Sequence, residues 1–253
     1  MNVTYTMLEL RRIVRDPINM FFTAVLPAFF YLVFGAAQDF ATEDAGNGNV
    51  AMYIMVSMAA YGALTATVSI GGSAAVERMQ GWGRQLGLTP MRDPSYVASK
   101  AFVAVAVALV PILLVFALGR LTGAEGTATA WVLAGLVVVA GACIFALYGL
   151  CFGLAIRSES AIGAASGSIV ILAFLGNLFF PLSGTLLSIA KFTPLYGYVS
   201  LARYPVTEGA NQTTSDGQLI SEPLWVPLLN VAVWTAVLAL VAKWLVRRSR
   251  GRQ

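Results

Sequence analysis

Six long runs without a charged residue divide this chain, and they restrict its fold more than any other feature. The runs cover residues 17–38, 45–76, 101–119, 126–156, 160–190 and 223–242. A helix needs about 20 apolar residues to cross the ~30 Å hydrocarbon core of a bilayer. Each run is long enough for one such helix, and none is comfortably long enough for two. The sequence therefore predicts an all-α integral membrane protein with six transmembrane helices, at about 18–38, 51–74, 98–119, 129–156, 160–181 and 224–246.

The chemistry missing from the chain excludes several function classes. The sequence contains no histidine, which removes the commonest general base and the commonest metal ligand. No G-x-x-x-x-G-K-[ST] segment is present to bind the phosphates of ATP. The uncharged runs that form the middle of the predicted spans carry no ionisable side chain, whereas ion-driven transporters usually have ionisable residues within the membrane. We therefore expect no catalytic residue, no metal site and no cofactor on this chain.

The distribution of basic residues predicts the orientation. Only Arg120, Lys191 and Arg203, of 16 lysines and arginines, fall on one side of the six-span topology. Cytoplasmic loops of membrane proteins carry the excess of Lys and Arg. Both termini of this multi-pass protein are therefore predicted to be cytoplasmic. The high ratio of Arg to Lys, 13 to 3, is typical of a high-GC bacterium, in which the membrane around the cytoplasm is the inner membrane.

Two segments outside the spans have a distinctive pattern. Residues 3–15 place Leu10 and Ile13 on an apolar side and Glu9 and Arg12 on a polar side, which is typical of a helix lying among lipid headgroups. Residues 182–204 are too apolar for a solvated loop, and we expect short re-entrant helices that dip back into the outer leaflet.

The stretch ERMQGWGRQLGLTPMRDPSYVASK, residues 77–100, interrupts the apolar sequence in the first cytoplasmic loop. Its prolines, among them Pro90, stop helix propagation, so that only a short exposed helix fits between them. Trp82, Leu86 and Leu88 are apolar anchors flanked by charge, a combination suited to docking on a partner protein. The alternative is an amphipathic loop that rests on lipid headgroups.

These segments resemble the type-2 ABC exporter permeases, in the branch of the daunorubicin and multidrug-resistance permeases. The opening pattern of that family, Glu-x-x-Arg followed by Arg-Asp-Pro, is matched by Glu9, Arg12, Arg15, Asp16 and Pro17. Its loop pattern is matched by Glu77, Arg78, Gly81, Leu86, Thr89, Pro90, Tyr96 and Lys100. The late outer segment is matched by Pro181, Pro194, Leu195 and Gly209.

The resemblance implies a single permease domain over residues 1–253, with residues 3–15 as a connecting helix and residues 83–91 as a coupling helix. Two permease copies, identical or related, would pair with two ABC ATP-binding subunits that carry ATP and Mg. The residues implied in docking are Glu77, Arg78, Trp82, Arg84, Leu86, Leu88, Thr89, Pro90 and Arg12. Membrane lipid is the other expected partner, and no nucleic acid is expected.

The resemblance also implies a substrate path between two permeases, lined by the second and fifth spans. Its candidates are Ser57, Tyr61, Thr65, Ser69, Ser166, Ile169, Ala173, Asn177 and Phe180. The polar residues of the second span repeat every four positions, so they face either a wet path or neighbouring helices to which they hydrogen-bond. Without charge, the path would favour lipophilic or amphipathic cargo such as a drug, an antibiotic or a lipid. The function expected is ATP-driven export, including multidrug efflux, by alternating access. The alternative is a membrane-embedded assembly factor or enzyme with a cytoplasmic docking loop.

Overall fold

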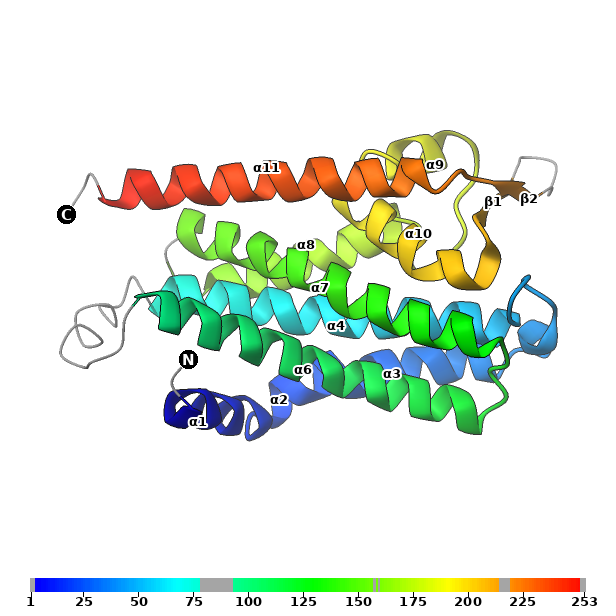
Figure 1. The fold of residues 1–253 in the computed structure, drawn as a ribbon, viewed down its shortest axis with the longest axis horizontal. Helices are drawn as coiled ribbons and strands as arrows, with labels where there is room; N and C mark the ends of the chain where they lie inside the picture. Colours follow the sequence, from blue (N-terminus) through cyan, green and yellow to red (C-terminus); the bar gives the residue numbers. More distant parts are fainter. Residues whose placement is uncertain (1–2, 78–92, 157, 159, 214–218, 251–253) are drawn as a thin grey trace.

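The computed structural model describes residues 3–77, 93–156, 158, 160–213 and 219–250, and within these the fold is a helix bundle (Figure 1). The predicted docking residues Arg78, Trp82, Arg84, Leu86, Leu88, Thr89 and Pro90, and the predicted coupling helix at 83–91, lie outside the described residues. Five helical stretches are long and apolar enough to cross a membrane: Pro17–Ala36, Val50–Glu77, Ser95–Leu121, Ala128–Ile156 and Trp225–Arg248. The predicted all-α membrane class is confirmed, although only five of the six expected spans reach full length among the described residues.

The first spanning stretch is not a uniform α-helix. Asp16 caps its start by accepting a hydrogen bond from the backbone N–H of Asn19, at 3.0 Å. Pro27 lacks a backbone N–H and would clash in a regular helix, and a π-helical turn comes directly before it. After α1 (Val3–Val14), the segments are α2 (Pro17–Met20), η1 (Phe21–Val25), α3 (Leu26–Tyr31) and η2 (Leu32–Ala36).

Helix α4 (Val50–Glu77) forms the centre of the bundle, because 83% of its apolar 18-residue stretch is buried inside the protein. It lies between α6 (Asp93–Leu121) and α7 (Ala128–Ile156). A methyl group added at Gly149 of α7 would overlap the backbone oxygen of Val68 on α4. Thr67 of α4 also donates a hydrogen bond to the Ala142 carbonyl of α7, at 2.7 Å. Small residues therefore let these two backbones touch, as is usual for helices packed within membranes.

The fifth predicted span is shorter than expected. Helix α8 covers Ser160–Leu175, about 24 Å at 1.5 Å per residue, instead of reaching residue 181. Asn177 adopts a left-handed backbone conformation, with φ of 62°, which ends the helix. The chain then turns through an irregular segment before α9 (Gly184–Ala190).

The predicted re-entrant segment is helical, and it is followed by a feature that an all-helical fold did not anticipate. Helix α10 covers Pro194–Thr207, three residues beyond the predicted end of that segment. Antiparallel strands β1 (Ala210–Thr213) and β2 (Leu219–Ser221) then lead into α11 (Trp225–Arg250). In Figure 1 these outer elements and η3 (Asp39–Thr42) lie at one end of the bundle, and both chain termini lie at the other.

Candidate functional site

A buried ionic cluster joins three helices at the end of the bundle where the termini lie. The Lys100 ammonium on α6 is 2.6 Å from the Glu9 carboxylate on α1 and 2.7 Å from the Glu77 carboxylate at the end of α4. The exposed fractions of these side chains are only 7%, 8% and 9%. Removing three charged groups from water costs free energy. The attraction between the lysine and the two carboxylates offsets this cost because the hydrogen-bond distances are short.

Two further side chains complete the cluster from its rim. Arg12 reaches Glu77 at 3.0 Å and Glu9 at 3.9 Å, with 59% of its side chain exposed. Partial burial lowers the pKa of Arg12, but the carboxylates of Glu9 and Glu77 outweigh this effect and raise the pKa above its ordinary value. The Tyr96 hydroxyl donates a hydrogen bond to Glu77 at 3.3 Å. Two acids and two bases therefore form a net neutral group.

Local sequence spacing brings these groups together. Glu9 and Arg12 are three residues apart on α1, and Tyr96 and Lys100 are four apart on α6, so that each pair shares a helix face. Leu10 and Ile13 of α1 pack against a small apolar core shared by α4 and α6. The prediction that Glu9 lies on the aqueous side of this helix is wrong, because the side chain points into the protein and binds Lys100.

The cluster joins α1 to the helices on either side of the segment 78–92. Glu77 is the last described residue before that segment, and α6 begins at Asp93 directly after it. Among the predicted docking residues, Glu77 and Arg12 are described, and the structure brings them into direct contact. The ion pairs tie α1, α4 and α6 to one another at this end of the bundle.

The predicted path residues on α4 are mostly engaged within the protomer. Ser57 donates a hydrogen bond to the Tyr53 carbonyl at 2.8 Å, and Thr65 donates to its own helix at 2.9 and 3.0 Å. Tyr61 is 4% exposed and packs on a phenylalanine ring. Thr65 and Ser69 are half-buried. In this conformation Ser57 and Thr65 satisfy their hydroxyl donors inside the protomer, and the exposure of the polar stripe to cargo stays a prediction.

The predicted path residues on the α8 side divide into two groups. Ile169, Ala173 and Asn177 are fully buried and face the interior. Ser166 is half-buried, and Phe180 has 51% of its side chain exposed. The structure therefore brings only the second group to the surface of a single copy.

An aromatic cluster lies where α3, α4 and the end of α8 meet, and most of it was missed from the sequence. The Phe179 ring is 5.2 Å from Tyr61, 5.8 Å from Phe30 and 5.0 Å from Phe174. Phe34 and Phe180 also pack against each other, with ring centroids 5.9 Å apart. The i,i+4 spacing of the first-span phenylalanines was a signal that could have indicated a shared face. Hereafter "the aromatic cluster" means these residues: Phe30, Phe34, Tyr61, Phe174, Phe179 and Phe180.

Arg203 of α10 is another functional candidate that the sequence did not single out, since it was predicted only as a cation on the outer side. Its side chain is 2% exposed. It donates hydrogen bonds to Ser57 at 2.8 Å and to the carbonyls of Asn177 and Leu178 at 2.6 Å each, and its guanidinium lies 4.1 Å from the centre of the Tyr53 ring. A buried guanidinium needs such hydrogen-bond acceptors to compensate for the loss of water. Arg203 therefore fixes the segment that follows α8 onto α4 and α10.

Comparison with known proteins gives the family. The family described as "ABC-2 type transporter" matches residues 3–207. The chain is also similar to the protein named "Putative transport permease YvfS" from Bacillus subtilis (strain 168), with 23% identity over 248 residues and coverage of 96% of each chain. The matched region contains the ionic cluster, α4 and α8, and the multi-pass architecture agrees with a membrane component that works beside a separate ATP-binding subunit. This chain belongs to the ABC-2 type transporter family, and it is a transmembrane ABC transporter permease.

Proposed function

We propose that this protein is the permease subunit of an ATP-driven exporter that moves lipophilic or amphipathic compounds across the cytoplasmic membrane. The observation that carries the proposal is the buried ionic cluster, which joins the two helices that flank residues 78–92 to α1. A loop that only rested on lipid headgroups would need no such internal anchorage at its two ends. An ATPase that pushes on this loop would move three helices as one unit.

We further propose that residues 83–91 are the coupling helix and that two ATP-binding subunits, carrying ATP and Mg, dock there. Both termini and this loop would be cytoplasmic, which agrees with the chain ends lying at the same end of the bundle as the ionic cluster (Figure 1). ATP-driven closure of the ATPases would then switch two permease copies between inward-facing and outward-facing states.

The partner copy would cover the α8 face of the protomer. Gly163 and Gly167 have no atom within 4 Å of the position where a side chain would begin. Ile171 and Phe174 on the same helix are 63% and 52% exposed. Small residues beside large apolar ones suit close contact between membrane helices, and the same face carries the half-exposed Phe180 at the edge of the aromatic cluster.

The aromatic cluster supports lipophilic cargo with ring systems. Its Phe174 and Phe180 rings keep about half of their surface exposed on the face that a second copy would cover. Aromatic rings stack favourably on other rings with little need for charge. No salt bridge is found around this cluster in the described residues, so it offers nothing to select a strongly ionic compound.

The test begins with co-purification of the permease and the ATPase encoded beside it. Wild-type permease should retain a stoichiometric ATPase, and the double variant Leu86→Asp, Leu88→Asp should lose it. Glu43→Lys, at an exposed position of the outer loop, is the matched control and should leave binding unchanged. Inverted membrane vesicles that contain the complex should accumulate a lipophilic dye only with ATP. Failure of the ATPase to bind wild-type permease would refute docking, and ATP-dependent loss of dye from such vesicles would refute export.

A further inference from the structure

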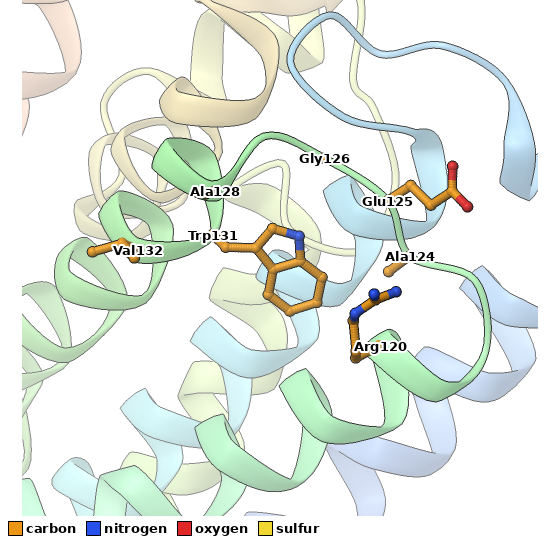
Figure 2. A pocket seen from close by; sticks show the side chains of 7 residues that line it. All are labelled: Arg120, Ala124, Glu125, Gly126, Ala128, Trp131 and Val132. Atoms are coloured by element: carbon orange, nitrogen blue, oxygen red, sulfur yellow. The ribbon is translucent and has the colours of Figure 1, made fainter.

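A cavity of about 650 Å³ opens between the end of α6 and the beginning of α7. Figure 2 shows its charged and aromatic walls: Arg120 at the end of α6, Glu125 in the connecting turn and Trp131 in the first turns of α7. The volume lies in the range of sites that hold small organic ligands, about 300–1,000 Å³. None of the residues that line it belongs to the ionic cluster or to the predicted substrate path.

The cavity lies at the depth where lipid headgroups are expected. The apolar stretch of α6 ends at Leu121, and that of α7 begins at Ala128, so the cavity opens at the level where two membrane spans end. Val132, which lines the cavity, is 61% exposed, and Leu136, one turn further along α7, is 60% exposed, so the two form an apolar surface that leads from the cavity toward the middle of the span. Tryptophan is enriched at this level of membrane proteins because its ring is apolar and its N–H is polar.

Backbone hydrogen bonds hold the connecting turn in place. Asn49 accepts a hydrogen bond from the Glu125 N–H at 3.0 Å, donates its own backbone N–H to the Glu125 carbonyl at 2.9 Å, and donates its side-chain amide to Gly123 at 2.8 Å. Thr127 donates its N–H to Asn47 at 2.9 Å. The cavity wall is therefore preformed, which lowers the entropy cost of binding.

Two opposite charges flank the cavity without binding each other. In the described ranges, neither Arg120 nor Glu125 takes part in a salt bridge. Figure 2 shows the Arg120 guanidinium extending toward the Ala124–Glu125 backbone, and the Glu125 carboxylate extending away from Trp131. A guanidinium binds a phosphate through two parallel hydrogen bonds, whereas a carboxylate binds an ammonium.

We propose that this cavity binds the headgroup of a phospholipid that carries both a phosphate and an ammonium group, such as phosphatidylethanolamine. The phosphate binds Arg120 beside the Trp131 ring, the ammonium faces Glu125, and the acyl chains run down the apolar surface of Val132 and Leu136. A lipid with a phosphate but no ammonium, such as phosphatidylglycerol, gains nothing from Glu125. The site therefore selects the zwitterionic lipid. This lipid is a bound component of the permease, distinct from its cargo, and the proposal needs only membrane insertion.

The test is native mass spectrometry of the purified full-length permease, equilibrated with equal amounts of phosphatidylethanolamine and phosphatidylglycerol. Wild-type protein should retain phosphatidylethanolamine preferentially. Arg120→Gln should lower the retention of both lipids about threefold to fivefold, as expected for one partly exposed charge-assisted contact. Glu125→Gln should lower the retention of phosphatidylethanolamine to that of phosphatidylglycerol, and so abolish the preference. Glu43→Gln, which removes another exposed outer carboxylate, should behave as wild type.

Three results would overturn the proposal. Arg120→Gln protein that retains both lipids as wild type does would show that the guanidinium holds no phosphate. Equal behaviour of Glu125→Gln and Glu43→Gln would remove the ammonium contact. Displacement of the retained lipid by millimolar inorganic phosphate would assign the cavity to a free anion.

Discussion

Replacing Lys100 by methionine removes the only buried cation of the ionic cluster and keeps a side chain of similar length. Glu9 and Glu77 would then face each other with exposed fractions of 8% and 9%, and Arg12 alone would remain to balance them. Two like charges held in a poorly hydrated site repel each other, and each also lacks the water that it would have when exposed. The substitution should therefore destabilise the contact of α1 with α4 and α6.

The magnitude follows from the burial of the remaining partners. Breaking a buried ion pair by removing one partner costs about 3–5 kcal/mol. Arg12 offsets little of this, because a bridge with 59% of the arginine exposed contributes about 0–1 kcal/mol. For a chain of this length about 1 kcal/mol corresponds to about 2–4 °C in Tm, so Lys100→Met should lower Tm by about 6–20 °C.

The assay is thermal unfolding of the purified permease in detergent, followed by loss of the monodisperse peak in size-exclusion chromatography. Lys243→Met, at an exposed position on α11, removes one positive charge as well and serves as the matched control. The double variant Glu9→Gln, Lys100→Met removes one acid together with the base and leaves Glu77 paired with Arg12. It should recover a clear part of the lost stability, which additive effects cannot produce.

Two outcomes would refute this reasoning. A Tm for Lys100→Met equal to that of Lys243→Met would mean that water reaches and solvates the cluster. A double variant less stable than Lys100→Met would mean that Glu9 stabilises the fold through some contact other than its ion pair.

Three more predictions follow from particular contacts. Gly149→Val should prevent accumulation of folded protein, because the new side chain would overlap the Val68 carbonyl. Gly167→Val should leave the protomer folded and weaken dimerisation, because nothing lies within 4 Å of that position in one copy. Expression level and size-exclusion chromatography check both results. Arg203→Met should abolish transport and lower Tm by several degrees, since the hydrogen bonds to Ser57 and to the Asn177 and Leu178 carbonyls are lost. Arg203→Lys should restore little, because an ammonium cannot reach all three acceptors. Tm and dye transport would be measured for both variants. Fusions after Thr213 should give active alkaline phosphatase and fusions after Gln253 fluorescent green protein, as a cytoplasmic C-terminus requires.

The bundle could be predicted from the sequence because its strongest signal is the absence of charge over lengths that match a bilayer. The end of α8 could not, since the uncharged run continues to residue 190 while the helix stops at Leu175. Hydropathy averages over many residues, whereas this helix ends through the backbone conformation of Asn177 and the bonds that Arg203 makes to the carbonyls beyond it.

The ionic cluster shows a different limit of sequence reasoning. Each of its charged residues belongs to a pattern that the sequence displays, yet the pairing of Glu9 with Lys100 joins positions 91 apart. Amphipathic periodicity assigns every charge to water, because a single helix carries no information about a partner on another helix. Opposite charges that neutralise one another can be buried together, whereas an isolated charge cannot. Only the packing of α1 against α6 shows that Glu9 has such a partner in Lys100.

Helix α4 connects two buried charged sites of the molecule. Glu77, at one end, belongs to the ionic cluster, and Ser57, twenty residues away, binds Arg203 near the other. Twenty residues of helix span about 30 Å, so one rigid element reaches from the proposed docking loop to the end of α8. Its direct backbone contact with α7 at Gly149 leaves no room for bending there. A push on residues 78–92 should therefore arrive at Arg203 as a movement of the whole helix, and the aromatic cluster beside Asn177 should open or close with it.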